Sequence, residues 1–106
     1  MGGQLASEGL ARWVAGGQVV VLDGRPEREY AAGHIPGAIS APLSELAEVA
    51  ARLPKRKGVV AYCRGPYCVY ADDAVRLLRA RGLKARRLDV GFPEWRRAGL
   101  PVEVAS

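Results

Sequence analysis

The chain has 106 residues, enough for one domain and too few for two, and its 49% hydrophobic and 25% charged residues exclude a disordered protein. A net charge of +5 favours small anions or acidic partners, but the basic residues lack the interleaved aromatics and the helix-turn-helix pattern that would indicate a nucleic-acid partner. Because no apolar run approaches the roughly 18 residues of a membrane span and residues 1–10 lack a secretory signal, we expect a cytoplasmic protein without a membrane partner.

The first half of the chain predicts helices alternating with short strands. Apolar residues at helical spacing predict a helix over 5–14 that stops at Gly16–Gly17. The apolar, β-branched run Val19–Leu22 predicts a buried strand, which Asp23 and Gly24 end. The other predicted elements of this half are a helical turn over 26–30, a turn or loop over 33–37, a short strand over 39–41 and a helix over 43–53 that ends before Pro54.

The second half repeats this alternation. The run Val59–Tyr62 predicts a second buried strand, and the segment Cys63–Cys68 follows it directly. A long amphipathic helix comes next and ends at Gly82. Its inward face is predicted to carry Ala71, Ala74, Val75, Leu77 and Leu78. The rest of the sequence predicts a strand over 83–88, a short helix over 91–95 and an irregular tail from Gly99.

Alternating strands and helices predict an α/β fold in which a mainly parallel sheet is covered on both faces. In such sheets the ligand site lies at the carboxyl ends of the strands. Asp23 and Cys63 each follow a predicted strand, so we expect both at that edge. We expect the whole chain, 1–106, to form one domain.

The segment from Cys63 to Cys68 joins a strand to a helix, where backbone N–H groups without helical partners and the helix dipole favour an anion. These groups should stabilise a Cys63 thiolate and raise its reactive fraction. Arg64 adds a positive charge that could also point to solvent, Gly65 lets the loop turn its amides inward, and Pro66 removes one donor. A buried core thiol is the alternative, but an Arg-Gly-Pro continuation favours a reactive Cys63.

Cys68 stands five positions after Cys63, and three roles are open for it. It could resolve a Cys63 persulfide or sulfenate into a disulfide, relay sulfur, or pack at the helix N-terminus as a small apolar residue. Tyr67 could shape the entrance to the loop. We expect no cofactor and no metal, because only Cys63, Cys68 and His34 could serve as zinc ligands.

Several short motifs, in this order along the chain, resemble the signatures of rhodanese domains. The N-terminal signature is VLDxR at 21–25 with EYxxGHIPGAI at 29–39, and YCR at 62–64 resembles the start of the active-site loop. GFPEW at 91–95 and GLPV at 99–102 resemble the C-terminal signature, so the similarity covers about 19–102. The string CRGPYC also resembles rhodanese domains fused to arsenic-type repressor DNA-binding domains, although we expect no such repressor domain in this sequence.

The resemblance implies a five-stranded, mainly parallel sheet with helices on both faces, and a sulfur transfer in two displacements. The Cys63 thiolate would attack the outer sulfur of thiosulfate or another sulfane donor and release sulfite. The persulfide would then pass its sulfur to cyanide or to a small or protein thiol, while the loop amides stabilise its negative charge. The substrate-binding loop implied is Arg64, Gly65, Pro66, Tyr67, Cys68 and Val69.

Three further residues could support this site. The histidine at this position of rhodanese domains has a structural role, so the resemblance implies that His34 fixes its loop by a hydrogen bond. A general-base role is the alternative. Asp23 and Arg25 could form an ion pair that braces the active loop, or a solvated surface pair.

The loop departs from the common rhodanese pattern. Gly65 comes one position early, Cys68 stands where an arginine is expected, and the segment that ends at Gly82 is about two residues longer than usual. Longer loops are typical of rhodanese-fold phosphatases and arsenate reductases, but those enzymes depend on the arginine that is missing here. The sequence therefore predicts a sulfurtransferase first, a persulfide or redox sensor using Cys63 and Cys68 second, and an oxyanion enzyme third.

Overall fold

The structure is a computed structural model that describes residues 4, 5, 9, 12, 17, 19–64, 69–88 and 91–104. Its strands and helices alternate along the chain, as the sequence predicts. In chain order they are β1 (Gln4–Leu5), β2 (Val19–Asp23), α2 (Glu27–Ala32), β3 (Ile39–Ser40), α3 (Leu43–Ala51), β4 (Gly58–Tyr62), α4 (Val69–Ala80), β5 (Lys84–Leu88) and α5 (Phe92–Arg97).

The strands form one five-stranded sheet in the order β1-β5-β4-β2-β3, and every neighbouring pair is parallel. The predicted fold class, a parallel sheet flanked by helices, is therefore confirmed. Strands β2 and β4 lie beside each other at the centre, with Asp23 opposite Tyr62 at their carboxyl ends. This register brings the residues that follow the two strands to the same edge of the sheet.

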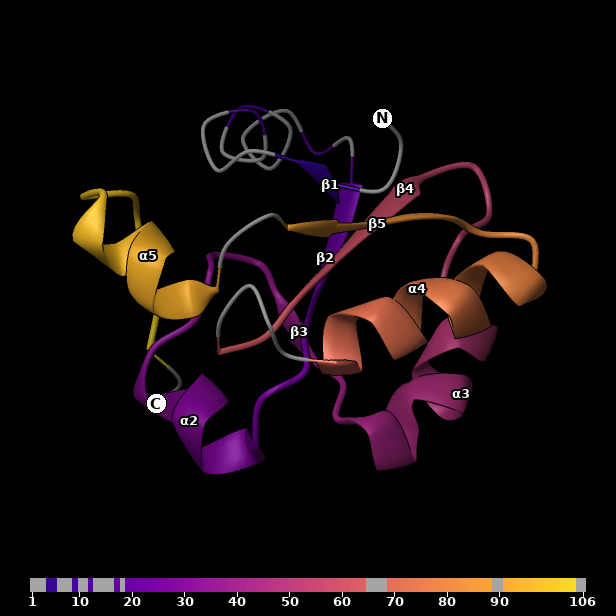
Figure 1. Ribbon diagram of the computed structural model, residues 1–106, viewed down its shortest axis with the longest axis horizontal. Coiled ribbons are helices and arrows are strands. Elements are labelled where there is room, and N and C mark those ends of the chain that lie inside the picture. The colour runs from indigo at the N-terminus through magenta and orange to yellow at the C-terminus, as the bar shows by residue number, and fades with distance from the viewer. Residues whose placement is uncertain are drawn as a thin grey trace.

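The two central strands are apolar up to Asp23, the last residue of β2, because both of their faces are covered. Side chains alternate between the faces. Leu22, Val59 and Ala61 point into a core cluster shared with α3 and α4. Val21 and Tyr62 point into a second cluster on the other side, which includes residues of α5. Figure 1 shows α3 and α4 together on one side of the sheet, and α2 and α5 on the other.

Helix α4, which follows the Cys63–Cys68 segment, has a well-defined end. Gly82 adopts a positive φ of 85°, the left-handed conformation that favours glycine. Its N–H donates to Arg79 O, and the N–H of Leu83 donates to Leu78 O. This pair of bonds is the Schellman motif, which satisfies the last carbonyls of the helix and turns the chain into β5.

One predicted element is partly wrong. Leu5 was expected in a helix over 5–14, but it belongs to β1 and pairs with Leu88 of β5. A two-residue edge strand is too short to show a period of its own, and its partner lies at the other end of the sequence. Gly9 and Arg12 are helical, and the rest of that prediction lies outside the described residues. The tail from Gly99 was expected to be irregular, yet Glu103 forms an antiparallel bridge with His34.

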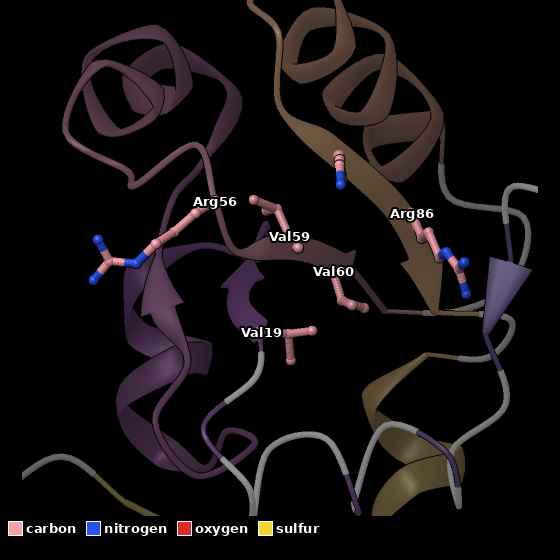
Figure 2. A pocket seen from close by; sticks show the side chains of 7 residues that line it. Val19, Arg56, Val59, Val60 and Arg86 are labelled. Atoms are coloured by element: carbon pink, nitrogen blue, oxygen red, sulfur yellow. The ribbon is translucent and has the colours of Figure 1, made fainter.

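At the amino ends of the strands lies a pocket of about 290 Å³. Figure 2 shows Val19, Val59 and Val60 in this pocket, flanked by Arg56 and Arg86. It lies at the opposite edge of the sheet from the carboxyl ends of β2 and β4. No helix among the described residues is long and apolar enough to cross a membrane.

Candidate active site

Cys63 directly follows β4, at the carboxyl edge of the sheet where the sequence places it. The residue is buried and packs in the cluster shared with α3 and α4. Its carbonyl oxygen accepts a hydrogen bond of 3.0 Å from the N–H of Phe92, the first residue of α5. Cys63 is disulfide-bonded in this structure, so the thiolate that the predicted chemistry needs is the reduced form of this side chain.

Four of the predicted loop residues, Gly65, Pro66, Tyr67 and Cys68, lie outside the described residues. The amide cradle and the three roles of Cys68 therefore stay predictions. Val69, the last residue assigned to the loop, is the first residue of α4. The described part of the site accordingly consists of Cys63, Arg64 and the residues that hold them.

Asp23 and Arg25 form a buried ion pair beside the end of β4. Asp23 is 0% exposed and Arg25 is 6% exposed, which excludes the alternative of a solvated surface pair. The Asp23 carboxylate accepts hydrogen bonds from the Arg25 side chain at 2.7 Å, from the Arg25 backbone N–H at 2.8 Å and from the Tyr62 hydroxyl at 2.6 Å. These donors take the place of the water molecules that the buried carboxylate has lost.

Arg25 also links elements beyond its own turn. It donates to the carbonyl oxygen of Gly33, and its guanidinium carbon lies 4.2 Å from the centre of the Phe92 ring. Burial alone would lower the pKa of Arg25, but the hydrogen bonds to Asp23 and the charge of that carboxylate outweigh it and raise the pKa. The arginine therefore stays charged and joins the ends of β2 and α2 to the start of α5.

Tyr62 connects this ion pair to the strand that carries Cys63. Burial, followed by the nearby charge of Asp23, raises the pKa of Tyr62, so its hydroxyl keeps its proton and donates a hydrogen bond to Asp23. The same oxygen accepts a hydrogen bond of 3.2 Å from the N–H of Ile35. The Tyr62 carbonyl accepts from the N–H of Gly24 at 3.0 Å. The residue before Cys63 is thus fixed through both its side chain and its backbone.

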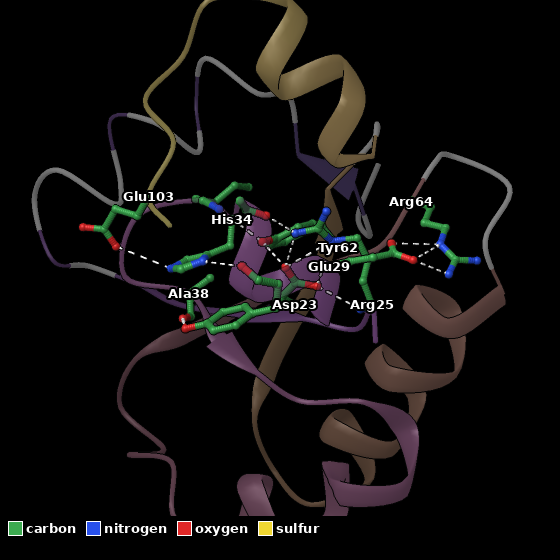
Figure 3. Close-up of polar contacts among 11 residues, drawn as sticks. Asp23, Arg25, Glu29, His34, Ala38, Tyr62, Arg64 and Glu103 are labelled. Carbon is green, nitrogen blue, oxygen red and sulfur yellow. Dashed lines mark hydrogen bonds and ion pairs between the residues drawn. The ribbon is translucent and has the colours of Figure 1, made fainter. Parts of the chain in front are cut away.

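His34 is buried and stacks on Tyr30, with the ring centroids 3.9 Å apart. Its Nδ1 lies 2.8 Å from Tyr30 O, a hydrogen bond in which the ring N–H donates to the carbonyl. Its Nε2 lies 3.6 Å from a carboxylate oxygen of Glu103. These contacts hold the 33–37 turn against α2 and the C-terminal tail, which fits the predicted loop-fixing role (Figure 3).

Arg64 extends away from the core and is 62% exposed. Its guanidinium forms a two-pronged ion pair with Glu29 of α2, with a distance of 3.0 Å from Nε to Oε1 (Figure 3). The hydrogen bond from Arg64 holds the pKa of Glu29 below its ordinary value. The first residue of the loop is therefore tied to α2, and the sequence reasoning did not identify this partner.

Glu29, Tyr62 and Phe92 contact the site but were not among the predicted site residues. All three fall within the quoted motifs, so the signal was their position in EYxxGHIPGAI, YCR and GFPEW. Their roles depend on which way each side chain points, and spacing does not give that. Among the described residues, no group of three or more His, Cys, Asp or Glu side chains is arranged to hold a metal.

Comparison with known proteins connects this geometry to one family. The model of the rhodanese-like domain matches residues 7–98. An HTH-type transcriptional regulator of Mycobacterium tuberculosis, Rv0324, is 54% identical over 94 residues, which are 89% of this chain and 42% of the regulator. A sulfurtransferase of Allochromatium vinosum is 31% identical over 100 residues, which are 93% of this chain and 92% of that protein. The chain therefore spans less than half of the regulator and nearly all of the sulfurtransferase.

Solved structures show the same fold. The BH2092 protein of Bacillus halodurans matches with a TM-score of 0.88 and 30% identity, over 96% of this chain and 77% of that one. A rhodanese-related protein of Thermoplasma volcanium matches with a TM-score of 0.83 and 27% identity, over 95% and 97% of the two chains. A Rhodopseudomonas palustris protein described as a possible tyrosine phosphatase matches with a TM-score of 0.78 and 27% identity, over 96% and 85%.

Proposed function

The chain belongs to the rhodanese-like family, and from this premise we propose that it is a sulfurtransferase in which Cys63 carries sulfur as a persulfide. The observation that supports this best is the place of Cys63. It directly follows the central strand β4 of a parallel sheet, at the edge where such sheets bind ligands. The 31% identity to a named sulfurtransferase over nearly its whole length supports the same reaction class.

The proposed reaction has two displacements. The Cys63 thiolate attacks the outer sulfur of thiosulfate, the sulfur–sulfur bond of the donor breaks, and sulfite leaves with the bonding electrons. A thiol or cyanide then attacks the outer sulfur of the Cys63 persulfide, and the electron pair returns to Cys63 as thiolate. The proposed partners are thus a small anionic sulfur donor and a thiol acceptor, in a reducing compartment such as the cytoplasm.

The described residues around Cys63 would hold it in position for both steps. Asp23, Arg25 and Tyr62 join the ends of β2 and β4 through buried hydrogen bonds. The N–H of Phe92 donates a hydrogen bond to the Cys63 carbonyl, and the N–H of Gly24 donates one to the Tyr62 carbonyl. The backbone of Cys63 and of the residue before it is therefore fixed. Such preorganisation limits the reorganisation that each displacement needs. The loop residues from Gly65 to Cys68 would supply the anion-binding amides, as the sequence predicts.

Intact-protein mass after incubation of the reduced protein with thiosulfate tests this proposal. We expect the wild type to gain one sulfur atom and to lose it when cyanide is added. Cys63→Ser should gain none, and Cys68→Ser is the matched control, with one cysteine removed from the same loop. A wild type that gains no sulfur, or a Cys63→Ser variant that gains as much as the wild type, would contradict the proposed role of Cys63.

A second candidate function is a persulfide or redox sensor that uses Cys63 and Cys68 without turnover. Two observations favour it: the relative with 54% identity is named a transcriptional regulator, and Cys63 is disulfide-bonded here. A sensor should lose two hydrogens to a disulfide after one exposure to a sulfur donor and then stop. A sulfurtransferase should release sulfite repeatedly while donor and acceptor last. If neither result is found, arsenate is the next substrate to test.

A further inference from the structure

The pocket at the amino ends of the strands, shown in Figure 2, is built on three neighbouring strands. Val19, Gly58 and Lys84 are the first residues of β2, β4 and β5, and Gly58 pairs with both of the others. Val60 pairs with Arg86 two positions further along. Paired residues of parallel strands point to the same face of a sheet, as do residues two apart in one strand. All five therefore lie on one face, the face that carries α2 and α5.

The floor of the pocket is apolar. Val60 is buried and Val19 is half-buried, and Gly58 has no side chain to fill the space beside them. A Cβ at Gly58 would lie 3.4 Å from Val19 Cγ1. The volume of about 290 Å³ is close to the lower end of the range of small-molecule sites. Such sites combine an apolar lining with a few polar groups that fix the position of the ligand.

Strand β5 supplies charge to this pocket. It lies between β1 and β4, and the inner strands of a parallel sheet are normally apolar because both of their faces are covered. Lys84 and Arg86 are instead exposed, and Ala85 between them is buried. Arg56, in the turn before β4, adds a third cation to the lining. In Figure 2 its guanidinium lies on the opposite side of the valines from that of Arg86, so the apolar floor has a cationic rim.

Arg56 and Lys84 have no acidic partner in the described part of the chain. None of the residues given for the lining is acidic, and neither cation takes part in an ion pair there. The sequence has no Asp or Glu at positions 49–71 or 74–88, the segments that contain these cations. A pocket with a cationic rim and an apolar floor favours a ligand that is both anionic and apolar.

We propose that this pocket binds a small organic anion, in which an apolar group of about the size of a benzene ring carries a phosphate or a carboxylate. The apolar group packs on Val19 and Val60, and Arg56 and Lys84 donate to the anionic group. Phosphate and carboxylate both suit these donors, since a guanidinium can bind either with two hydrogen bonds. The site lies at the opposite edge of the sheet from Cys63, so the proposal does not rest on the sulfurtransferase function and goes beyond it.

A titration that follows backbone amide signals by NMR tests this proposal on the whole chain. Phenyl phosphate and benzoate carry the two anionic groups, inorganic phosphate lacks the apolar group, and benzylamine carries the opposite charge. We expect at least one of the aromatic anions to shift the amide signals of Val19, Gly58 and Lys84 along one saturating curve. Inorganic phosphate should bind roughly tenfold more weakly than phenyl phosphate because it buries no apolar surface, and benzylamine should not bind.

Two variants separate the charge of the pocket from its shape. Arg56→Gln with Lys84→Gln removes two cations of the rim and should weaken binding of the tighter aromatic anion by roughly tenfold. The matched control, Arg52→Gln with Arg81→Gln, removes the same charge at two exposed positions that do not line the pocket, and binding should hardly change. Gly58→Val fills the floor and should abolish binding while the rim stays intact. The dispersion of its amide signals shows whether this variant folds, and if it does not, the two charge pairs still decide the proposal.

Four results would overturn the proposal. The first is that neither aromatic anion gives a saturating shift at the pocket amides. The second is a control pair that weakens binding as much as the pocket pair does, because the anion then responds to the general positive charge of this edge, as a nucleic acid or an acidic protein would. Equal binding of inorganic phosphate and phenyl phosphate would show that the valines take no part, and binding of benzylamine would show that the rim does not select an anion. If the proposal holds, the tighter of the two aromatic anions identifies the anionic group.

Discussion

The buried carboxylate of Asp23 organises the candidate site at the level of single residues. It accepts from the side chain and the backbone of Arg25 and from the hydroxyl of Tyr62. A charged pair away from water contributes little compared with a well-packed apolar pair, but removing one partner leaves a costly uncompensated group. The network of Asp23, Arg25 and Tyr62 therefore holds the ends of β2 and β4 in position. We expect the stability of the fold to fall when any one of these three side chains is removed.

Tyr62→Phe should show this sensitivity. The change removes the donor to Asp23 and leaves the N–H of Ile35 without its acceptor, in a position that is 0% exposed. We expect the free energy of unfolding to fall by about 2 kcal/mol, as for a buried hydrogen bond to a charged group. Urea denaturation followed by circular dichroism measures it. Tyr30→Phe, which removes a half-buried hydroxyl bonded to a backbone carbonyl, is the control and should cost less. Equal losses would contradict the special role of Tyr62.

Gly24 tests the packing beside the same carboxylate. A Cβ at this position would lie 2.0 Å from a ring carbon of Tyr70, and the ring is held because its hydroxyl donates to Ala41 O. We expect Gly24→Ala to destabilise the fold by about 1–3 kcal/mol through overpacking. Gly58→Ala, whose Cβ would meet Val19 at an ordinary 3.4 Å, is the matched control.

The clash can be separated from a backbone effect by a double-mutant cycle. In a Tyr70→Ala background the ring is gone, so Gly24→Ala should cost far less than it does in the wild type. Unfolding free energies of the two single variants and the double variant give this coupling. An additive result would mean that the two residues do not meet.

Sequence reasoning located some of these residues but not their contacts. Asp23 and Cys63 could be placed at one edge because both follow predicted parallel strands, and that rule depends only on topology. The choice between a buried and a solvated Asp23–Arg25 pair could not be made, because it depends on Tyr62 and Phe92 arriving from distant positions in the chain. Glu29 was not predicted as a site residue for the same reason, because its partner Arg64 is 35 positions away in the sequence.

At the level of elements, α2 is tied to the residue after Cys63 by the Glu29–Arg64 ion pair. The hydrogen bond from Arg64 lowers the pKa of Glu29 below its ordinary value of 4.5, and the charge of Arg28 adds a smaller effect. A carboxylate whose folded pKa is depressed contributes its stabilisation fully above the unfolded pKa. It loses that contribution as pH falls through the folded pKa. This tether is therefore intact at neutral pH and released only in acid, below about pH 4.5.

We predict that the Glu29 carboxyl titrates below 4.5 in the wild type and moves up toward that value in Arg64→Gln. Carboxyl chemical shifts followed by NMR across an acid titration measure it directly. Arg28→Gln removes a neighbouring cation without removing the hydrogen bond, so it should move the Glu29 pKa less than Arg64→Gln does. If the two variants move it equally, general charge rather than the specific pair controls Glu29.

The elements themselves were predictable where the chain is apolar in a simple pattern. Strands β2 and β4 are buried on both faces, so an unbroken β-branched run identifies them. The four strands predicted from periodicity are β2 to β5, and only the resemblance implied a fifth. Strand β1 was missed because it has two residues and exists through its pairing with β5. A local sequence pattern does not show which distant strand a segment pairs with. Leu5 pairs with Leu88, near the other end of the chain.

At the level of the whole molecule, the C-terminal tail closes the face of the sheet that carries α5. The backbone groups of His34 and Glu103 bond to each other at 2.8 and 2.9 Å, and the Trp95 indole N–H donates to Pro101 O at 2.7 Å. Leu100 and Val102 pack against the core cluster that contains Tyr62 and Phe92. The tail therefore covers the back of the same network that positions Cys63.

Removal of residues 100–106 should weaken this face of the molecule. It deletes four hydrogen bonds, one of them from Gly37 N–H to the exposed Glu103 carboxylate, and two half-buried apolar side chains, Leu100 and Val102, so we expect a loss of unfolding free energy on the order of 4 kcal/mol. Urea denaturation monitored by circular dichroism measures the loss, and Val104→Ala, at a position 68% exposed, is the control that should leave stability unchanged. The truncation should also slow persulfide formation, because the 33–37 turn loses its contacts with Glu103, and the carbonyl of Gly33 in this turn accepts a hydrogen bond from Arg25. A truncated chain with wild-type stability but impaired sulfur uptake would mean that the tail acts on the site by another route than packing, and one with both properties intact would show that these contacts contribute nothing.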